Sequence, residues 1–241
     1  MVAHPPPSTA FFTSLRPSTE SSGLPILLFL PGIEGSDFVF SRQADELSSS
    51  FDVRWLTLPS EDRSTFPSLV KMVREEIEKE SGDAGVYLVG ESFGGVLALS
   101  AALDSRGSSP NGLKGLVLIN PATSVGDSWA SSLPPLLEGL GSLPPGLSDP
   151  AYLALATPII SWSVGDPIKL ATRPEGRSLP PPLRLASVLS RLGGEMPSLL
   201  QLIESAKQTS ELPLRKLSLP VDLIASTDDR ILPSVREANR L

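Results

Sequence analysis

The chain has 241 residues, and 40% of them are hydrophobic, which fits one globular α/β domain with a substantial core rather than a disordered chain. Its formal net charge of −7 and the lack of a Lys/Arg cluster argue against a nucleic-acid-binding protein. There is no cysteine, which excludes disulfide bonds, thiolate catalysis and cysteine-based zinc sites.

The N-terminal segment differs in composition from the rest of the chain. Its first residues are rich in Ser, Thr and Pro, and Glu20 is their one acidic residue. We therefore interpret residues 1–23 as a disordered or transit-like leader. The longest apolar run, Leu24 to Pro31, is too short to cross a membrane. It predicts a buried parallel strand that ends in a tight turn.

Strands and helices alternate along the next hundred residues. Further strands are predicted at residues 52–58, 86–89 and 115–119, with helices between them at residues 66–77 and 93–103. Ser64 or Thr65 would cap the first of these helices. This alternation predicts an α/β fold with a mostly parallel, doubly wound sheet.

The alternation stops between residues 124 and 215, where proline pairs are interspersed with Leu-rich pieces. We interpret this segment as an inserted helical cap. A strand at Val221–Ala225 resumes the sheet, and a helix begins at Ser234. The predicted organisation is therefore a hydrolase-type core in two parts, residues 24–123 and an incomplete 216–241, separated by the cap.

The segment Gly90-Glu-Ser-Phe-Gly-Gly95 matches the G-x-S-x-G pattern between a predicted strand and a predicted helix. In the α/β-hydrolase fold, this context is a nucleophile elbow, a strained turn that presents a serine hydroxyl above the sheet. Ser92 is the predicted nucleophile. The backbone N–H of Phe93 is a predicted oxyanion donor, because it lies at the start of the following helix.

A second glycine turn, Pro31-Gly-Ile-Glu-Gly-Ser36, directly follows the first apolar strand. In this fold, the loop at that position supplies the other N–H of the oxyanion hole. The backbone N–H of Ile33 is the predicted donor, because the residue after the first glycine usually provides it.

The segment Ser226-Thr-Asp-Asp-Arg-Ile-Leu-Pro233 follows the strand that resumes the sheet. The fold places there the acid that orients the catalytic histidine. Asp229 is the predicted acid, and Asp228 is the second candidate. Either carboxylate could instead cap a helix or lie at the surface.

A serine nucleophile needs a base, and the fold orders its triad as serine, acid, histidine. The one histidine is His4, which lies in the leader, so the catalytic histidine is absent from this sequence. We expect the hydrolase region to be C-terminally truncated, and a noncatalytic derivative is the alternative. No phosphate loop or Cys/His cluster is present, so we predict no cofactor and no metal.

Several segments together carry a resemblance to a known family. They are Leu30-Pro-Gly-Ile-Glu-Gly35, Asp52-Val-Arg-Trp-Leu56, Asp62-Arg63, Leu88-Val-Gly-Glu-Ser-Phe-Gly-Gly95, Leu118-Ile-Asn-Pro-Ala-Thr-Ser124 and Gly165-Asp-Pro-Ile-Lys169. In this order, across Leu24 to Leu241, they resemble the plastid phytyl ester synthase family, which consists of esterase/lipase/thioesterase-like acyltransferases.

The resemblance implies an α/β-hydrolase fold with Ser92 as nucleophile and Asp229 as acid. It also implies an acyl lipid, acyl-CoA or acyl carrier protein as donor, and a long-chain alcohol such as phytol, or diacylglycerol, as acceptor. The implied location is the chloroplast, at plastoglobules or thylakoids, with peripheral lipid association and no transmembrane segment; a cytoplasmic location is the alternative.

We therefore expect a serine acyltransferase or esterase that acts on long-chain acyl lipids through an acyl-serine intermediate. Two other interpretations remain open. One is a plain carboxylesterase or lipase. The other is a catalytically silent lipid-binding relic, so the sequence leaves open whether the chain is an enzyme.

Overall fold

A computed structural model describes residues 9–16, 23–37, 39–59, 62–80, 82, 84–103, 108–127, 133–164, 186, 189, 217–229 and 232–241. The strands are β1 (Phe11–Ser14), β2 (Ile26–Leu30), β3 (Asp52–Thr57), β4 (Val86–Glu91), β5 (Leu113–Ile119) and β6 (Val221–Ile224). The helices are α1 (Ser41–Leu47), α2 (Phe66–Lys79), α3 (Phe93–Ala102), the 3₁₀ helix η1 (Ala122–Asp127), α4 (Leu133–Gly141), α5 (Pro145–Val164) and α9 (Ser234–Arg240).

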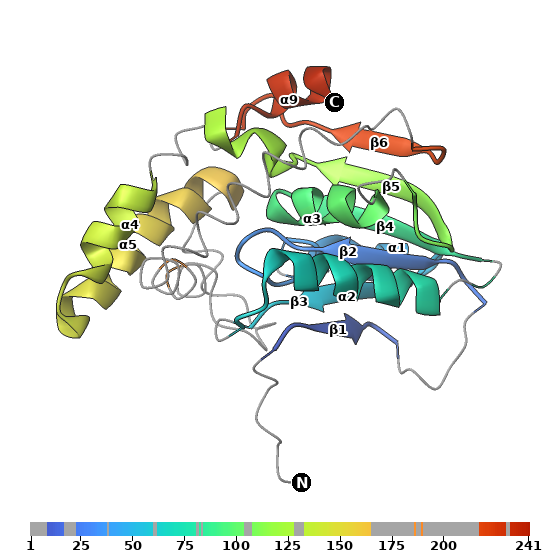
Figure 1. Cartoon of the computed structure of the whole chain (residues 1–241), viewed down its shortest axis with the longest axis horizontal. Helices are drawn as coiled ribbons and strands as arrows, with labels where there is room; N and C mark the ends of the chain where they lie inside the picture. Colours follow the sequence, from blue (N-terminus) through green and yellow to red (C-terminus); the bar gives the residue numbers. More distant parts are fainter. Residues whose placement is uncertain are drawn as a thin grey trace, which may run out of the picture.

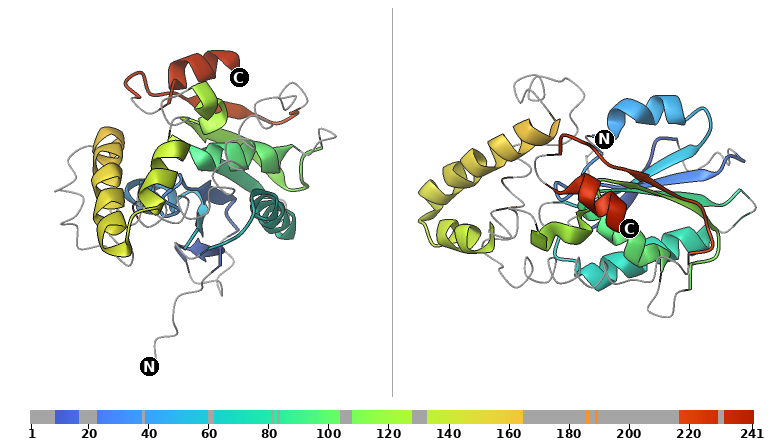
Figure 2. Two further views of the ribbon diagram at one scale, coloured as in Figure 1. Left: turned by 60° about the vertical axis from the view of Figure 1, so that its left-hand side comes forward. Right: turned by 90° about the horizontal axis from the view of Figure 1, so that it is seen from above.

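The strands form one six-stranded sheet in the order β1-β3-β2-β4-β5-β6. All neighbouring pairs are parallel except β1 and β3, which are antiparallel. Helices α2 and α3 cover one face of the sheet and α1 covers the other (Figures 1 and 2). The predicted α/β class with a mostly parallel, doubly wound sheet is confirmed.

The sequence of the central strand β2 is apolar throughout because the strand is buried on both faces. Leu28 and Leu30 face the cluster beneath α2 and α3, whereas Leu27 and Phe29 face the cluster beneath α1. All five residues of β2 are buried, because helices cover both faces of a parallel sheet. Phe29 stacks on Phe40, with ring centroids 4.4 Å apart.

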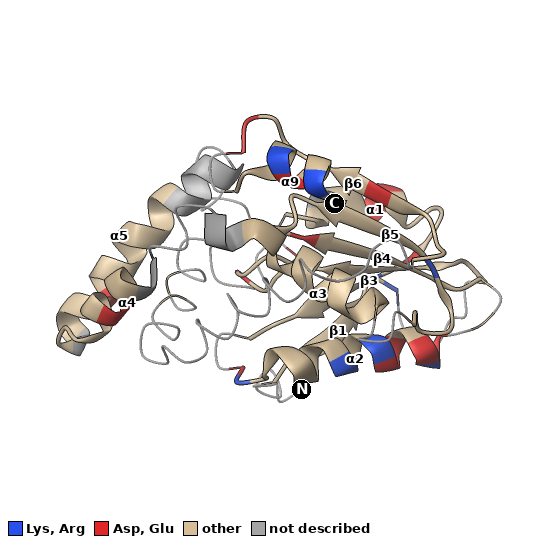
Figure 3. Ribbon diagram, turned by 45° about the horizontal axis from the view of Figure 1, so that its top comes forward, with Lys and Arg blue, Asp and Glu red and all other residues tan. Residues whose placement is uncertain are grey.

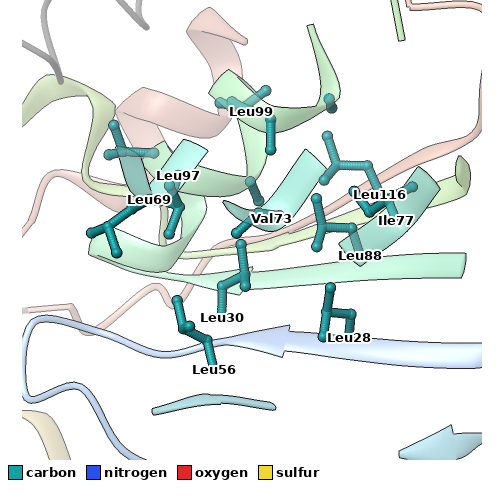
Figure 4. Packing of buried hydrophobic residues seen from close by; sticks show 14 of the residues in the cluster. Leu28, Leu30, Leu56, Leu69, Val73, Ile77, Leu88, Leu97, Leu99 and Leu116 are labelled. Atoms are coloured by element: carbon teal, nitrogen blue, oxygen red, sulfur yellow. The ribbon is translucent and has the colours of Figure 1, made fainter. Parts of the chain in front are cut away.

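Helix α2 follows the pattern that its sequence predicts. The Thr65 hydroxyl accepts a hydrogen bond from the Ser68 N–H at 3.3 Å, so Thr65 rather than Ser64 is the N-cap. The apolar stripe of α2 includes Leu69, Val73 and Ile77, and it packs on α3 and the sheet (Figure 4).

Strand β1 differs from the sequence expectation, because residues 11–14 belong to the segment interpreted as leader. The strand pairs with β3, and the Ala10 N–H donates a hydrogen bond of 2.6 Å to the Asp62 carboxylate. Asp62 is buried and also accepts hydrogen bonds from the N–H and hydroxyl of Ser64. The segment that leads into β1 is thus tied to the loop after β3.

Helices α4 and α5 lie beyond the end of the sheet at which the parallel strands finish (Figure 1). The buried Tyr152 joins them, because its hydroxyl donates to the Leu137 carbonyl at 3.0 Å. Helices α4 and α5 carry few charged residues, in contrast to α2 (Figure 3).

Both helices lie within the segment predicted as a cap. Most of that segment falls outside the described residues, so the domain division stays a prediction. None of the described helices is long and apolar enough to cross a membrane.

The core makes a direct prediction for stability. Leu69 on α2 is 5% exposed, whereas Leu147 on α5 is 62% exposed. We expect Leu69→Ala to lower the free energy of unfolding by roughly 2–5 kcal/mol, because it leaves a cavity between α2 and the sheet. The matched Leu147→Ala should stay within about 0.5 kcal/mol of the wild type. Urea titration followed by circular dichroism measures both, and equal losses would contradict this packing.

Candidate active site

Ser92 lies between the end of β4 and the first turn of α3. Its backbone has φ 52° and ψ −114°, a conformation that non-glycine residues rarely adopt. Such strain costs on the order of 1–3 kcal/mol, so neighbouring contacts must hold it. The Ser92 N–H donates to the Ile119 carbonyl at 2.9 Å, and the Ser92 carbonyl accepts from the Gly95 and Ala122 N–H groups at 3.0 Å each. This geometry is that of a nucleophile elbow.

The glycines around Ser92 are explained by close approach of the backbone. A Cβ atom on Gly94 would collide with the backbone carbonyl of Leu30 at the end of β2. A Cβ on Gly90 would collide with the Gly94 carbonyl and would lie 2.7 Å from the Ala98 Cβ. Helix α3 can therefore begin directly against the sheet only because these positions carry no side chain.

The predicted oxyanion turn lies beside the elbow. A Cβ placed on Gly32 would lie 3.7 Å from the Ser92 Cβ. The turn is closed by a hydrogen bond of 3.0 Å from the Gly35 N–H to the Gly32 carbonyl, and the Leu58 N–H binds the Gly35 carbonyl at 2.9 Å. The structure thus brings together Ser92 and the two segments that carry Ile33 and Phe93. The role of these two N–H groups as oxyanion donors stays a prediction.

Two acidic side chains lie next to this turn, and the sequence analysis did not single them out. Glu91 directly precedes Ser92, and Glu34 belongs to the oxyanion turn. Burial, and then the nearby charge of Glu34, raise the pKa of Glu91 to about 8. An acidic residue inside both glycine motifs was the available signal, because each motif lies where a parallel strand ends.

Asp229 follows β6, as predicted, and is half-buried, whereas Asp228 is exposed. One Asp229 carboxylate oxygen accepts from the Leu232 N–H at 3.0 Å, and the other accepts from the Ser234 hydroxyl. These bonds fasten the turn that leads into α9. The carboxylate therefore has a structural task in this chain, and its role as triad acid stays a prediction.

Two polar links that the sequence analysis missed connect the Asp229 loop to the rest of the site. Asn120 has a φ of 43°, and its side-chain oxygen accepts from the Ser226 N–H at 2.7 Å. Asparagine is one of the few residues that tolerate this left-handed conformation. On α9, the buried Glu237 accepts from the Thr123 hydroxyl and pairs with Arg240. The segments after β5 and β6 are thus joined side by side.

The base of the predicted triad has no counterpart in the described part of the chain, because His4 lies outside it. Within the described ranges, no group of three His, Asp or Glu side chains could hold a metal ion. Ser92 lies in a strained turn between strand and helix, beside the glycine turn, as the sequence predicts; its role as nucleophile stays a prediction.

The fold and this site define an α/β hydrolase. In agreement, residues 25–240 match the alpha/beta hydrolase fold family, and the chain belongs to it. Two relatives from Arabidopsis thaliana are similar in sequence. The chain is 33% identical to phytyl ester synthase 1, chloroplastic, over 90% of its own length and 32% of that protein. It is 36% identical to phytyl ester synthase 2, chloroplastic, over 57% of its own length and 19% of that protein.

The chain therefore spans about a third, or less, of the length of these relatives. Among solved structures, an α/β-hydrolase-fold protein from Burkholderia ambifaria is similar with a TM-score of 0.63 and 17% identity. That likeness covers 94% of this chain and 80% of the other. At this identity it supports the fold alone.

The contact between α3 and β2 can be tested with a pair of glycine substitutions. We expect Gly94→Ala to destabilise the chain by about 1–3 kcal/mol or more, because the new methyl group meets the Leu30 carbonyl. Gly139→Ala in α4 is the control, because its Cβ would meet nothing within 4 Å. It should stabilise by about 0.5–1 kcal/mol through the higher helix propensity of alanine. Thermal unfolding measures both, and a neutral Gly94→Ala would refute the contact.

Proposed function

We propose that this chain forms the hydrolase region of a serine acyltransferase or esterase, which acts on long-chain acyl lipids through an acyl-Ser92 intermediate. The observation that carries the proposal is the strained backbone of Ser92 at the start of α3, beside the Gly32–Gly35 turn. Strain of this kind persists where surrounding contacts impose it, and such positions cluster at active sites.

The proposed chemistry has two halves. In the first, Ser92 Oγ attacks the acyl carbonyl carbon, the carbonyl oxygen gains negative charge, and the bond to the leaving alcohol or thiol breaks. The Ser92 proton passes to a histidine base, which this sequence does not supply, and from that base to the departing group. In the second half, an acceptor hydroxyl attacks the acyl-serine and regenerates Ser92. Water as acceptor gives hydrolysis, and a long-chain alcohol gives a new ester.

The names of the relatives suggest the substrates. Both are called phytyl ester synthases, so phytol, a long-chain alcohol, is the proposed acceptor, with diacylglycerol as a second. Acyl lipid, acyl-CoA or acyl carrier protein would be the donor. Both names include the word chloroplastic, and we propose the same location for this chain, at plastoglobules or thylakoids.

Helices α4 and α5 support an apolar substrate. They lie past the end of the sheet that carries Ser92 (Figure 1), and Leu136 of α4, Leu147 of α5 and Leu143 between the two helices are exposed. We propose that the segment of residues 124–215, to which they belong, forms the cap over an acyl-binding pocket. Apolar walls of this kind bind long acyl chains by burying their methylene groups.

The nucleophile is tested with Ser92→Ala in the protein made from the complete gene, because no histidine follows Ser92 in this sequence. We expect hydrolysis of p-nitrophenyl laurate to fall at least roughly a thousandfold, because no acyl-enzyme can form without the hydroxyl. Ser49→Ala, at an exposed serine after α1, should keep the wild-type rate. Unchanged turnover in Ser92→Ala would refute the proposal. Mass spectrometry of products formed with added phytol distinguishes transfer from hydrolysis.

A second candidate function is favoured by the contacts of Asp229. Its carboxylate fastens the turn before α9, which is also what a helix-capping role requires. A chain that has kept the fold and uses this acid only for structure would be a silent lipid-binding relic.

The Asp229→Asn substitution separates the two functions. If Asp229 is the triad acid, the rate at which a fluorophosphonate labels Ser92 should fall roughly a thousandfold or more, because the base loses its orienting charge. If the chain is a silent relic in which the carboxylate only caps the turn, the wild type should not be labelled at Ser92, and Asp229→Asn should lower the melting temperature alone. Asp222→Asn, at an exposed position on β6, is the control. A loss confined to Asp228→Asn would move the acid to that residue.

A further inference from the structure

We propose that Thr123 and Glu237 form a buried clasp that sets the position of the Asp229 loop relative to Ser92. Both are positioning residues in this role, because they act through the segments that they join and not on the substrate. The inference rests on the proposed function, since it describes how two predicted catalytic groups from distant parts of the chain are held in one arrangement.

On the side of the nucleophile, the clasp begins next to the elbow. The Ala122 N–H donates to the Ser92 carbonyl at 3.0 Å, and Thr123 is the next residue of η1. A Cβ on Gly95, in the first turn of α3, would lie 2.8 Å from the Pro121 Cβ, so the start of η1 lies directly against the elbow. A movement of Thr123 would therefore reach the backbone of Ser92 through a single residue.

On the side of the acid, the clasp ends in α9, the helix that follows the Asp229 loop. The Asp229 carboxylate accepts from the Leu232 N–H and from the hydroxyl of Ser234, which is the first residue of α9. Glu237 lies one turn further along this helix, and its N–H donates to the Pro233 carbonyl at 2.9 Å. The position of α9 therefore determines where the Asp229 carboxylate lies.

The two sides meet in a buried polar contact where α9 packs on η1 (Figure 2). Thr123 and Glu237 are each 2% exposed, and the Thr123 hydroxyl donates to Glu237 Oε1. Arg240 binds the same carboxylate with two nitrogen atoms, at 2.9 Å from Nε to Oε2 and 2.5 Å from Nη2 to Oε1. Its Nη2 also donates to the Thr123 hydroxyl oxygen at 3.3 Å. Both carboxylate oxygens thus have donors, as a buried charge requires.

A polar contact of this kind fixes orientation more sharply than apolar packing does. The hydrophobic effect has no direction, whereas a hydrogen bond needs its donor and acceptor aligned within a narrow range of distances. A second polar link, from the Ser226 N–H to the Asn120 side chain, lies on the other side of the loop. Ser226 precedes Asp229 and Glu237 follows it, so the loop is held to the segment after β5 at both ends.

The clasp is tested with Thr123→Val in the protein made from the complete gene, because valine keeps the shape of threonine and removes its hydroxyl. We expect fluorophosphonate labelling of Ser92 to slow about tenfold, because a small displacement of the acid weakens the base that it orients. Thr123→Ser, which retains the hydroxyl, should restore the wild-type rate. Thr65→Val, which removes the N-cap of α2, should lower the melting temperature and leave labelling unchanged. A Thr123→Val rate equal to that of the wild type overturns the positioning role.

A double variant isolates the contact between the two side chains. Glu237→Leu removes the acceptor and should also slow labelling. If both residues act through one hydrogen bond, Thr123→Val combined with Glu237→Leu should be no slower than the slower single variant, because the contact can be lost only once. Losses that multiply in the double variant would contradict the shared role.

Hydrogen exchange of the same proteins separates the clasp from the proposed function. In Thr123→Val, we expect faster exchange both in α9 and at the Ala122 N–H, because the clasp protects the two sides together. Faster exchange in α9 alone would show that the contact does not reach the elbow, and the clasp would be rejected. A wild type that is not labelled at all refutes the proposed function, while the exchange rates still decide the clasp.

Discussion

The contact between the first turn of α3 and the end of β2 is the constraint on which the site depends. Gly94 lies so close to the Leu30 carbonyl that only hydrogen fits between the two backbones. With α3 held there, the chain must turn sharply as it leaves β4, and Ser92 takes up its positive φ. The same closeness brings the turn after β2 alongside Ser92. One steric contact therefore positions Ser92, the N-terminus of α3 and the glycine turn together.

Much of this fold could be predicted from local sequence patterns. Burial explains the uninterrupted apolar run of β2 and the amphipathic stripe of α2, and close backbone approach explains the glycines around Ser92. Each of these requirements produces a pattern among residues that are close in sequence. The short strand β1 lay outside such patterns, because its stability comes from pairing with β3 and from the bond between Ala10 and Asp62. Its polar, proline-rich surroundings matched a disordered leader equally well.

The positions of the candidate site residues along the chain could be predicted from the sequence, but the charge interactions between them could not. Ser92 and the glycine turn have motifs, whereas the proximity of Glu34 to Glu91 arises from two strands that are distant in sequence and adjacent in the sheet. Asp229 was identified by position, but its bonds to Leu232 and Ser234 depend on how α9 begins. Contacts between residues that are distant in sequence leave no local sequence pattern. Such contacts determine the pKa of Glu91 and the orientation of the Asp229 carboxylate.

The hydrogen bond between Ala10 and Asp62 limits where the N-terminal segment can be cut. A processing protease that removed residues beyond Ala10 would strip β1 from the sheet and take a donor from a buried carboxylate. It would also expose the backbone of β3 as a free edge, which other extended chains can join. The covered edge of β3 and the satisfied Asp62 carboxylate therefore both depend on Ala10 and β1.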